Sequence, residues 1–598
     1  NIECEIIKND IPSYGRLYYN KSKKYLLFKQ EPNNFNNEEG YKYFFLLSYL
    51  EVNNNKKSNN QKIILQKKYD KNVLILIDNI EEIIEMRILL LWKGFEIYLK
   101  NGKSYVFNFL TTNEYNNFMN NFILNIQIKH LVRKRDFLSD KNDITKSWTK
   151  YLISNFEYLL ILNRYSSRSF NDLSQYYIFP WLLHDYKYLK SYNQKEKYYL
   201  KIKNELLKIK ENSKDNIDYL KNIKNKGKQI IVQDEFDAKK KLLIKDGLDY
   251  NEYKDFIKNE KNIFYKIIRD FKFPPSFQND KNKNKAKTNY ELEESNNTKL
   301  PSHTGIHYSN NSYIYFFLMR QLPFDNLLVK LQGFNLENPN RCFLSIDSIL
   351  SRINTGQDNR ELIPEFFSKI DFLLNLNCSS YGERDSKILV DDCEMQNIIT
   401  KKKKTYLSIY VDFLLEHKKI MNSKLIGIYL KEWIDNIFGC NQLPPKNKRK
   451  ESYNIFVKYS YEQIINLEKK LDKKLKKGNK TEKKIKTSLK MNIDYIINFG
   501  VCPSVIFKEP HPKLNLGINN NININRDNNK YKEDINDDED NNDIEAFIQD
   551  SIASQKLYYS ICGELLFFKI NPTINKIFVY IKEDNIIILD CQLFNEIS

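Results

Sequence analysis

Short apolar runs alternate with polar turns over the first 130 residues, and this pattern predicts β-strands. The β-rich runs are residues 26–28, 62–65, 74–77, 95–99 and 104–109. Asn101-Gly102, between the last two runs, predicts a hairpin turn. Residues 111–128 place apolar side chains near one face, with Thr112 as a candidate cap, which predicts one helix. Strands followed by a single helix predict a β-sandwich closed by a C-terminal helix.

The pattern changes between residues 148 and 186. We expect a helix over 148–163, but after it neither a helical nor a strand period persists. Trp181 and its apolar neighbours favour burial, whereas Arg168 and Asp172 are costly to bury without partners. Pro180 removes a backbone donor and disfavours a helix before it. We therefore predict a buried, irregular segment whose polar side chains satisfy backbone groups that lack a regular ladder.

This segment resembles the signature of BEACH domains, the domains of beige and neurobeachin proteins. In that family Asn-Asp-Leu, Gln-Tyr, Phe-Pro-Trp and Asp-Tyr recur in this order, and His-Tyr-Ser-Asn, Pro-Glu-Phe-Phe and Trp-Ile-Asp follow downstream. The matching residues, which the resemblance assigns to the domain core, are Asn163, Arg168, Asn171, Asp172, Leu173, Gln175, Tyr176, Phe179, Pro180, Trp181, Asp185, Tyr186, His307, Tyr308, Ser309, Asn310, Pro364, Glu365, Phe366, Phe367, Trp433, Ile434 and Asp435. Two features depart from the family pattern: Ser167 replaces a glycine, and a Pro-Trp turn is absent between residues 388 and 406.

The strand-rich segment resembles the pleckstrin-homology-like (PH-like) module that precedes BEACH domains. Residues 4–7 with 15–17 are similar to its first hairpin, and residues 80–89 with 96–99 to its later strands. The resemblance implies a partner-binding groove between the two modules. The residues expected in that groove are Arg87, Trp92, Tyr98, Asn155 and Glu157.

We predict a multidomain α+β chain, a PH-like plus BEACH tandem fragment. A PH-like β-sandwich with a C-terminal helix precedes a mostly α-helical BEACH domain whose core contains irregular extended segments. The expected parts are a PH-like domain at 1–129, a linker at 130–145, the BEACH domain at 146–512, an Asn-rich and acidic disordered linker at 513–550, and a possible first blade of a WD40-type propeller at 551–598. Low-complexity insertions are expected near 187–228, 278–298, 388–404 and 466–490.

Composition changes this picture only slightly. The net charge of +19 is compatible with nucleic-acid or anionic-membrane binding, but its excess is lysine in Asn- and Ile-rich tracts, so we interpret it as compositional bias. The eight cysteines are scattered singly, which is typical of reduced thiols in the cytosol. No apolar run approaches the ~20 residues of a membrane-spanning helix. The chain starts at Asn1, so we expect the native N-terminus to be missing.

Two motifs with candidate chemistry are better explained as structure. Gly102-Lys103-Ser104 lacks the earlier glycine of a phosphate-binding loop and is flanked by strands. His303 and His307 have the spacing of helical zinc ligands, but Pro301 and Gly305 argue against a helix, so we interpret them as buried structural histidines.

The carboxylates of the family segments fit ion pairs or caps better than an acid–base pair. They are Asp172, Asp185, Glu361, Glu365 and Asp435, and the expected partners are Arg168, Arg320 and Arg341. We predict no catalytic, cofactor-binding or metal residue and no enzymatic activity.

The resemblance implies a non-catalytic scaffold in membrane or vesicle trafficking that binds protein partners through the interdomain groove. It implies a cytoplasmic location peripheral to intracellular membranes, with no nucleic-acid or small-molecule substrate. The alternative is a peripheral membrane adaptor that binds anionic lipid through the PH-like module and the Lys-rich insertions. For that alternative we expect Lys21, Lys23 and Lys24 in the loop between the first two strands.

Overall fold

The computed structural model describes sixteen stretches of the chain and the single residue Tyr192. The stretches are residues 2–8, 11–31, 72–88, 91–109, 111–124, 131–132, 144–189, 268–298, 300–332, 338–377, 379–395, 406–462, 499–514, 565–571, 576–581 and 585–590. We call the part up to residue 132 the first module and residues 144–514 the second module.

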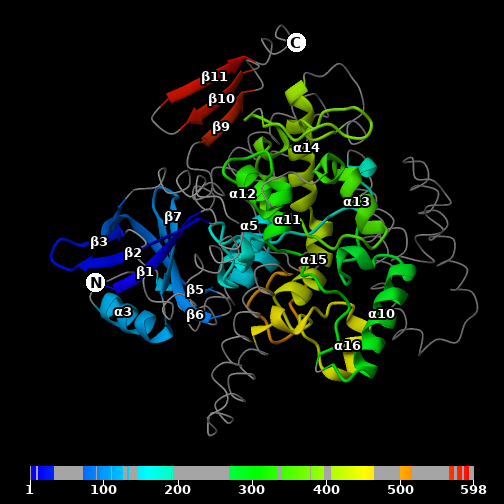
Figure 1. The fold of residues 1–598 in the computed structure, drawn as a ribbon, viewed down its shortest axis with the longest axis horizontal. Helices are drawn as coiled ribbons and strands as arrows, with labels where there is room; N and C mark the ends of the chain where they lie inside the picture. Colours follow the sequence, from blue (N-terminus) through cyan, green and yellow to red (C-terminus); the bar gives the residue numbers. More distant parts are fainter. Residues whose placement is uncertain are drawn as a thin grey trace, which may run out of the picture.

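The first module is a curled sheet that lies beside the helical second module (Figure 1). Its strands are β1 (Ile2–Lys8), β2 (Ile11–Asn20), β3 (Tyr25–Gln30), β4 (Val73–Leu76), β5 (Ile80–Ile88), β6 (Leu91–Leu99), β7 (Ser104–Phe109) and β8 (Leu131–Val132). The spatial order is β4-β3-β2-β1-β7-β6-β5-β8, antiparallel except for the last pair. Four of the five predicted β-rich runs are thereby confirmed, and residues 62–65 lie outside the described stretches.

Turn chemistry explains the order of the strands. Gly102 adopts a φ of 80° in the β6–β7 turn, the left-handed conformation that favours glycine, so the predicted Asn-Gly hairpin is confirmed. The prediction for the lysine turn is wrong. Lys21, Lys23 and Lys24 lie between β2 and β3, because the first two strands are joined near residues 9–10.

Helix α3 (Thr112–Leu124) closes the sheet and starts one residue earlier than the predicted cap at Thr112 implies. Thr111, and not Thr112, caps the helix: its hydroxyl accepts from the Glu114 amide at 3.2 Å, and the Glu114 carboxylate accepts from the Thr111 amide at 3.0 Å. A glutamate three residues after the threonine makes this reciprocal capping box. Phe95 on β6 stacks on Phe118 of the helix, with ring centroids 5.9 Å apart.

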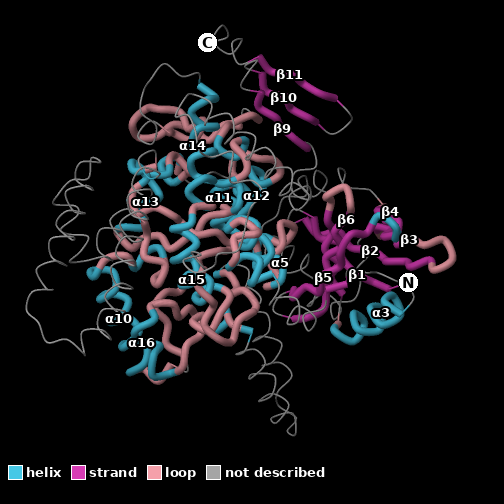
Figure 2. Tube along the Cα trace, turned by 180° about the vertical axis from the view of Figure 1, so that it is seen from behind, coloured by secondary structure: helices cyan, strands magenta, loops and turns pink. Residues whose placement is uncertain are grey.

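The second module is built from helices joined by long irregular segments (Figure 2). The helices are α5 (Asn155–Tyr165), α10 (Asp280–Ser295), α11 (Asn311–Phe317), α12 (Phe324–Leu331), α13 (Ile346–Asn354), α14 (Tyr406–Met421), α15 (Lys424–Ile437) and α16 (Arg449–Ser452). Short 3₁₀ turns are η2 (Ile77–Asn79) in the first module and η3 (Leu173–Gln175), η4 (Tyr186–Tyr188), η5 (Pro275–Phe277), η6 (Pro339–Arg341), η7 (Pro364–Phe367), η8 (Asp371–Leu373), η9 (Lys446–Lys448) and η10 (Lys458–Ser460) in the second.

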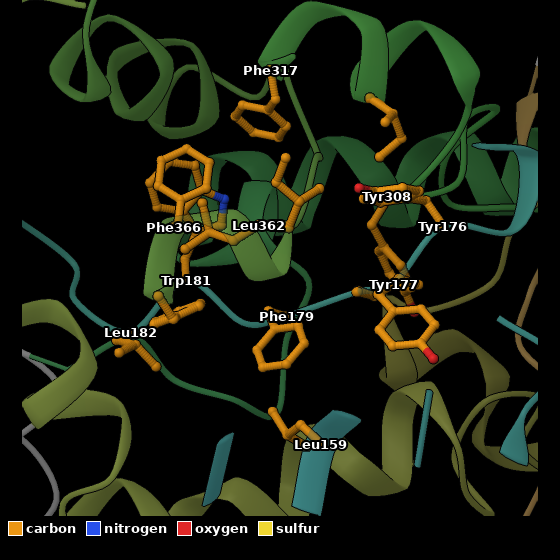
Figure 3. Packing of buried hydrophobic residues seen from close by; sticks show 14 of the residues in the cluster. Leu159, Tyr176, Tyr177, Phe179, Trp181, Leu182, Tyr308, Phe317, Leu362 and Phe366 are labelled. Atoms are coloured by element: carbon orange, nitrogen blue, oxygen red, sulfur yellow. The ribbon is translucent and has the colours of Figure 1, made fainter. Parts of the chain in front are cut away.

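Every residue from 166 to 183 is buried, and we call this segment the central peptide. Its aromatic and aliphatic side chains are surrounded by helices of the second module, as Figure 3 shows for Phe179 and Trp181. Its backbone N–H and C=O groups find individual hydrogen-bond partners instead of forming a regular ladder. The Asn163 amide group donates to the Ile178 carbonyl and accepts from the Ile178 N–H, and Phe179 forms an isolated two-residue bridge with Leu362. The predicted buried, irregular segment is therefore confirmed.

The sequence patterns misplace two helices. The helix expected over 148–163 is interrupted, because Tyr151 has a φ of 62° and Ser154 with Glu157 forms a new capping box that starts α5. The stretch interpreted as an insertion at 278–298 contains the 16-residue helix α10. Asn279 caps this helix, and its buried residues Asn282, Ala286 and Tyr290 recur at intervals of four, which a Lys/Asn-rich composition hides.

Three antiparallel strands are described near the C-terminal end of the chain, β9 (Leu565–Asn571), β10 (Lys576–Ile581) and β11 (Asn585–Asp590). They lie within residues 551–598, the region expected to hold the first blade of a propeller. A propeller blade remains a prediction for this region.

The described stretches bear on two predictions made from composition, one about the state of the cysteines and one about membrane-spanning helices. Cys4, Cys342, Cys393, Cys440 and Cys502 are free thiols. None of the helices in these stretches has the length and apolar content needed to cross a bilayer.

Replacing Ser167 by glycine should stabilise the second module. Ser167 is buried with a φ of 65°, and its hydroxyl has no hydrogen-bond partner among the described residues. Relief of left-handed strain and removal of an unsatisfied hydroxyl should together raise the free energy of unfolding by about 1 kcal/mol. Urea unfolding of the full chain measures this, with Ser167→Ala as the control that removes only the hydroxyl. A Ser167→Gly variant no more stable than Ser167→Ala would show that the backbone there is unstrained.

Acidification should destabilise the second module through its buried histidines. Burial lowers the pKa of His417 to about 3, although the ring also bonds the Phe366 carbonyl, and burial lowers the pKa of His511 to about 3. The unfolded chain therefore binds more protons below about pH 6.5, and stability is lost as the pH falls from there towards 3. For His417 alone the loss between pH 7.5 and 5.0 should be about 2 kcal/mol.

The variant His417→Gln tests this contribution because glutamine keeps polar atoms but does not titrate. We expect it to be less stable than the wild type at pH 7.5 and to lose less stability on going to pH 5.0. Equal losses in the two proteins would contradict the assignment.

Candidate functional site at the interface between the modules

The β5–β6–β7 end of the sheet faces the central peptide and its helix α5 (Figure 1). Polar side chains from both modules meet there, and we call this set the seam. The seam consists of Glu82, Arg87, Trp92, Glu96, Tyr98 and Ser104 from the first module, and Arg164, Asn171, Gln175, Glu462 and the Cys502 carbonyl from the second.

Arg87 enters the second module from the end of β5 and is 1% exposed. Its guanidinium donates to Glu462 Oε2 at 3.1 Å, to the Cys502 carbonyl at 2.7 Å and to Gln175 Oε1 at 3.4 Å. Gln175 returns the contact, because its amide donates to the Arg87 carbonyl and to Asp172 Oδ2. One cation of the sheet thus joins three separate parts of the second module.

Trp92 on β6 holds the other oxygen of the same carboxylate. Its indole N–H donates to Glu462 Oε1 at 2.9 Å, so Glu462 is shared between two strands of the first module. The Glu462 side chain is 19% exposed, which places this contact at the margin of the seam. The shared carboxylate links the ends of β5 and β6 to the residues that follow η10.

Glu96 is a fully buried carboxylate without a basic partner in the described contacts. It accepts from Tyr98 Oη at 2.7 Å, from Ser104 Oγ at 2.6 Å and from Asn171 Nδ2 of the central peptide at 2.9 Å. Burial raises the pKa of Glu96, and these donors oppose the rise by stabilising the charged form. Asn171 therefore completes a hydrogen-bond network that the first module alone leaves incomplete.

Arg164 lies in the last turn of helix α5 and reaches in the opposite direction, from the second module to the sheet. It pairs with Glu82 on β5, and its guanidinium lies 3.9 Å from the ring centroid of Tyr98. Both charged side chains are nearly buried, at 12% and 15% exposure. A cation over an aromatic ring in a desolvated site contributes roughly 2 kcal/mol.

Backbone carbonyls, as well as carboxylates, hold the buried arginines in the seam and next to it. Burial, followed by the charge of nearby Arg87, lowers the pKa of Arg168 to about 9. Arg168 donates to the Tyr176 and Val501 carbonyls. Burial likewise lowers the pKa of Arg87, and Glu462 offsets part of that effect. Separating the modules would leave the Arg87 guanidinium without Glu462, Gln175 and the Cys502 carbonyl, which is the large penalty in breaking buried ion pairs.

The five residues expected in an interdomain groove separate into two groups. Arg87, Trp92 and Tyr98 lie in the seam. Asn155 and Glu157 are used inside the second module instead: Asn155 bonds Trp148 and the Met421 and Ser423 carbonyls, and Glu157 caps α5. The expectation is wrong for these two because the first turn of α5 starts in the core, and only its last turn reaches the sheet.

The sequence alone does not predict several of the seam residues. Glu462 follows Arg87 by 375 positions, and no local pattern marks it. Glu96 gives a weak signal, as a charged residue inside the apolar run Phe-Glu-Ile-Tyr-Leu at 95–99. Period-two alternation would place Glu96 on the polar face of the strand, and the docked central peptide is what buries it.

The other signature residues lie in the second module's core, and all of them except Asp185 are buried. Their polar groups bond one another and the backbone. Tyr176 Oη donates to Glu365 at 2.7 Å, and the His511 N–H donates to Asp435 at 2.7 Å. Asp185 caps η4 by accepting from the Lys187 N–H.

The predicted arginine partners of the carboxylates are largely wrong. Glu361 pairs with Arg269 at 2.7 Å and accepts from Trp433 Nε1 at 3.0 Å. Arg320 instead donates to the Asp391 and Phe343 carbonyls. Irregular buried backbone offers unpaired carbonyls, and these compete for the buried guanidinium groups.

His303 and His307 are buried, at 4% and 0% exposure, so their interpretation as core histidines is confirmed. Burial lowers the pKa of His303 to about 4, and the pKa of His307 also falls, mainly from burial. Within the described stretches, no group of three histidine, cysteine or acidic side chains is arranged to hold a metal.

Removing Arg87 should uncouple the modules. We expect Arg87→Ala to lower the stability of the full chain by about 3–5 kcal/mol, since it removes the buried guanidinium that bonds Glu462 Oε2 and the Cys502 carbonyl. Glu462→Gln should cost less because Glu462 is partly exposed, and the double variant should show coupling between the two sites. The matched control is Arg16→Ala, whose pair with Glu3 is 40% and 47% exposed and contributes under about 1 kcal/mol.

Urea unfolding provides the measurement. The wild type should unfold in one transition that includes both modules, and Arg87→Ala should show two. Equal stability losses for Arg87→Ala and Arg16→Ala would contradict a structural role for the seam.

Comparison with known proteins matches both modules. The family model described as Beige/BEACH domain matches residues 146–239 and 249–514, and the model described as PH domain associated with Beige/BEACH matches residues 22–123. Among the relatives are Beige protein homolog 1 of Saccharomyces cerevisiae (28% identical over 380 residues, 63% of this chain and 13% of the relative) and BEACH domain-containing protein lvsE of Dictyostelium discoideum (26% over 444 residues, 73% and 16%). The lysosomal-trafficking regulator of Drosophila melanogaster is 26% identical over 377 residues, 62% of this chain and 8% of the relative.

The chain thus spans between 8% and 16% of the length of these relatives. The Beige/BEACH model nevertheless covers more than half of the chain. The chain therefore belongs to the BEACH family, with a BEACH-associated PH-like module ahead of its BEACH domain.

Proposed function

We propose that this chain is a non-catalytic scaffold in membrane or vesicle trafficking, and that it binds protein partners on the surface where its two modules meet. The single observation that carries the proposal is the shared carboxylate of Glu462, held at once by Arg87 and Trp92. A fixed angle between two modules creates one continuous surface, which neither module has alone. A relative named lysosomal-trafficking regulator supports the cellular process.

The composition of the seam's margin supports a protein partner. Trp92, Arg164 and Glu82 are partly exposed there, and tryptophan and arginine are enriched among residues that dominate protein binding. Because both modules contribute to this margin, a partner that touches both would favour the docked arrangement.

The polar groups of the BEACH core support a structural rather than catalytic role. Glu361, Glu365 and Asp435 are each committed to ion pairs or hydrogen bonds inside the fold. A general acid or base needs access to a substrate. These contacts instead join separate segments of the BEACH core, and the Tyr176 contact includes the central peptide.

Site-specific photocrosslinking in the full chain tests the proposal. A benzophenone amino acid at Glu81, exposed on β5, or at Tyr459, on η10, places the probe on either side of the seam's margin. We expect both probes to capture the same protein from a cell extract, whereas a probe at Leu152, exposed elsewhere on the BEACH domain, should not. The recombinant partner should then bind Arg87→Ala at least tenfold more weakly than Arg16→Ala. Equal capture from position 152, or equal binding by the two variants, would contradict a partner site at the seam.

A further inference from the structure

The BEACH domain exposes a group of leucines on a part of its surface that the seam does not use. Leu322, Leu376 and Leu389 are 58%, 67% and 70% exposed. They belong to three segments: the turn before α12, the stretch that follows η8, and a short hairpin at residues 382–390. A leucine that is exposed singly is ordinary, but a group of exposed leucines in one place indicates an interaction site.

Hydrogen bonds hold these three segments side by side. The Asn377 amide donates to the Arg320 carbonyl at 3.0 Å, and Arg320 Nε donates to the Asp391 carbonyl at 2.7 Å. The side-chain amide of Asn375 donates to the Asp391 carboxylate at 2.8 Å. Each exposed leucine lies within two residues of one of these bonded groups. The fold therefore sets the proximity of the three leucines.

Carboxylates border the leucines. Glu383 pairs with Leu389 in an isolated antiparallel bridge, so their side chains lie on the same side of the hairpin. Asp385 is exposed in the turn of that hairpin, and Asp391 is exposed where it bonds the residue next to Leu376. The set consists of Leu322, Leu376, Leu389, Glu383, Asp385 and Asp391, and we call it the acidic–apolar surface.

The sign of the local charge is opposite to that of the whole chain. Residues 371–395 include six acidic and two basic residues, whereas the chain has a net charge of +19. The ion pair on the hairpin joins Arg384 to Glu394. Within the described stretches, Glu383, Asp385 and Asp391 take part in no ion pair. These three carboxylates therefore remain available to a basic ligand.

We propose that the acidic–apolar surface docks a basic amphipathic helix of a protein partner. A helix with an apolar stripe flanked by lysine or arginine matches the leucines and the carboxylates at once. An anionic bilayer and a nucleic acid fit less well, because both carry the charge that these carboxylates repel. This second partner site goes beyond the function proposed for the seam. The two surfaces share no residue, so the two proposals can fail independently.

Fluorescence anisotropy with the full chain tests the proposal. The probe is a labelled synthetic helix of about 18 residues, with leucine on one face and lysine on the other. A comparison peptide replaces the leucines by alanine and keeps the charge. Because the chain as a whole is strongly positive, its net charge opposes binding of both peptides. We expect the leucine–lysine probe to bind roughly tenfold more tightly than the alanine peptide, and its binding to weaken with added salt.

A charge-reversal variant locates the bound probe. Glu383→Lys/Asp385→Lys reverses two charges of the acidic–apolar surface. The matched control Glu291→Lys/Glu509→Lys reverses two exposed carboxylates elsewhere on the BEACH domain, so the change in net charge is the same. We expect the surface variant to bind the probe roughly tenfold more weakly than the control.

A second pair of variants tests the leucines. Leu376→Ser/Leu389→Ser removes two of them, and Leu152→Ser/Leu292→Ser removes two exposed leucines from other parts of the BEACH domain. All four side chains are exposed, so we expect both proteins to fold. The surface variant should bind the probe roughly tenfold more weakly than its control.

Three results would overturn the proposal. One is equal binding of the probe by a surface variant and its matched control. Another is equal binding of the probe and the alanine peptide by the wild type. The third is loss of self-association or of phosphatidylcholine vesicle binding in Leu376→Ser/Leu389→Ser with unchanged probe binding, which would assign the leucines to a second copy of the chain or to a bilayer.

Discussion

The hydrogen-bonding demand of the central peptide constrains the rest of this structure. Residues 166–183 are buried throughout, yet they form neither a long helix nor a strand within a sheet. Each buried backbone group and each buried charge there needs an individual partner. Asn163, Asp172 and Gln175 provide some of these partners from within or beside the peptide. The remainder comes from distant parts of the chain, so the peptide holds the BEACH domain together through polar as well as apolar contacts.

The first module supplies some of these distant hydrogen-bond partners, and this explains why the two modules dock. Gln175 donates to the Arg87 carbonyl, and Asn171 donates to the buried carboxylate of Glu96. In return, Arg87 and Trp92 find their acceptor in Glu462. The contacts are reciprocal, so neither module satisfies its buried polar groups alone. These reciprocal contacts hold the two modules in one relative geometry.

The sequence predicted the structure correctly where neighbouring residues are incompatible with a regular helix or strand, and where they form a recurrent turn motif. The mixture of Trp181, Pro180 and Arg168 excludes regular structure, and Asn101-Gly102 permits few backbone geometries besides a tight turn. The predictions failed where the contacting residues are far apart in the sequence, and where a polar composition hides the period of a helix. No local pattern marks Glu462 as a partner of Arg87. The sequence of α10 is a polar tract with few apolar residues. Asn155 lies on the core side of α5 and not on the side that faces the sheet. These errors share one cause, since tertiary contacts decide which polar residues are buried.

Native-state hydrogen exchange, read by mass spectrometry on the full chain, tests the central claim that the modules form one cooperative unit. The amides of β5 and β6 and those of the central peptide should exchange through the same opening, with equal free energies in the wild type. When Glu462→Gln weakens the shared carboxylate, both sets of amides should lose protection together. If the strand amides lose protection while the amides of residues 176–183 keep the wild-type values, the two modules are independent and the seam is only a contact between them.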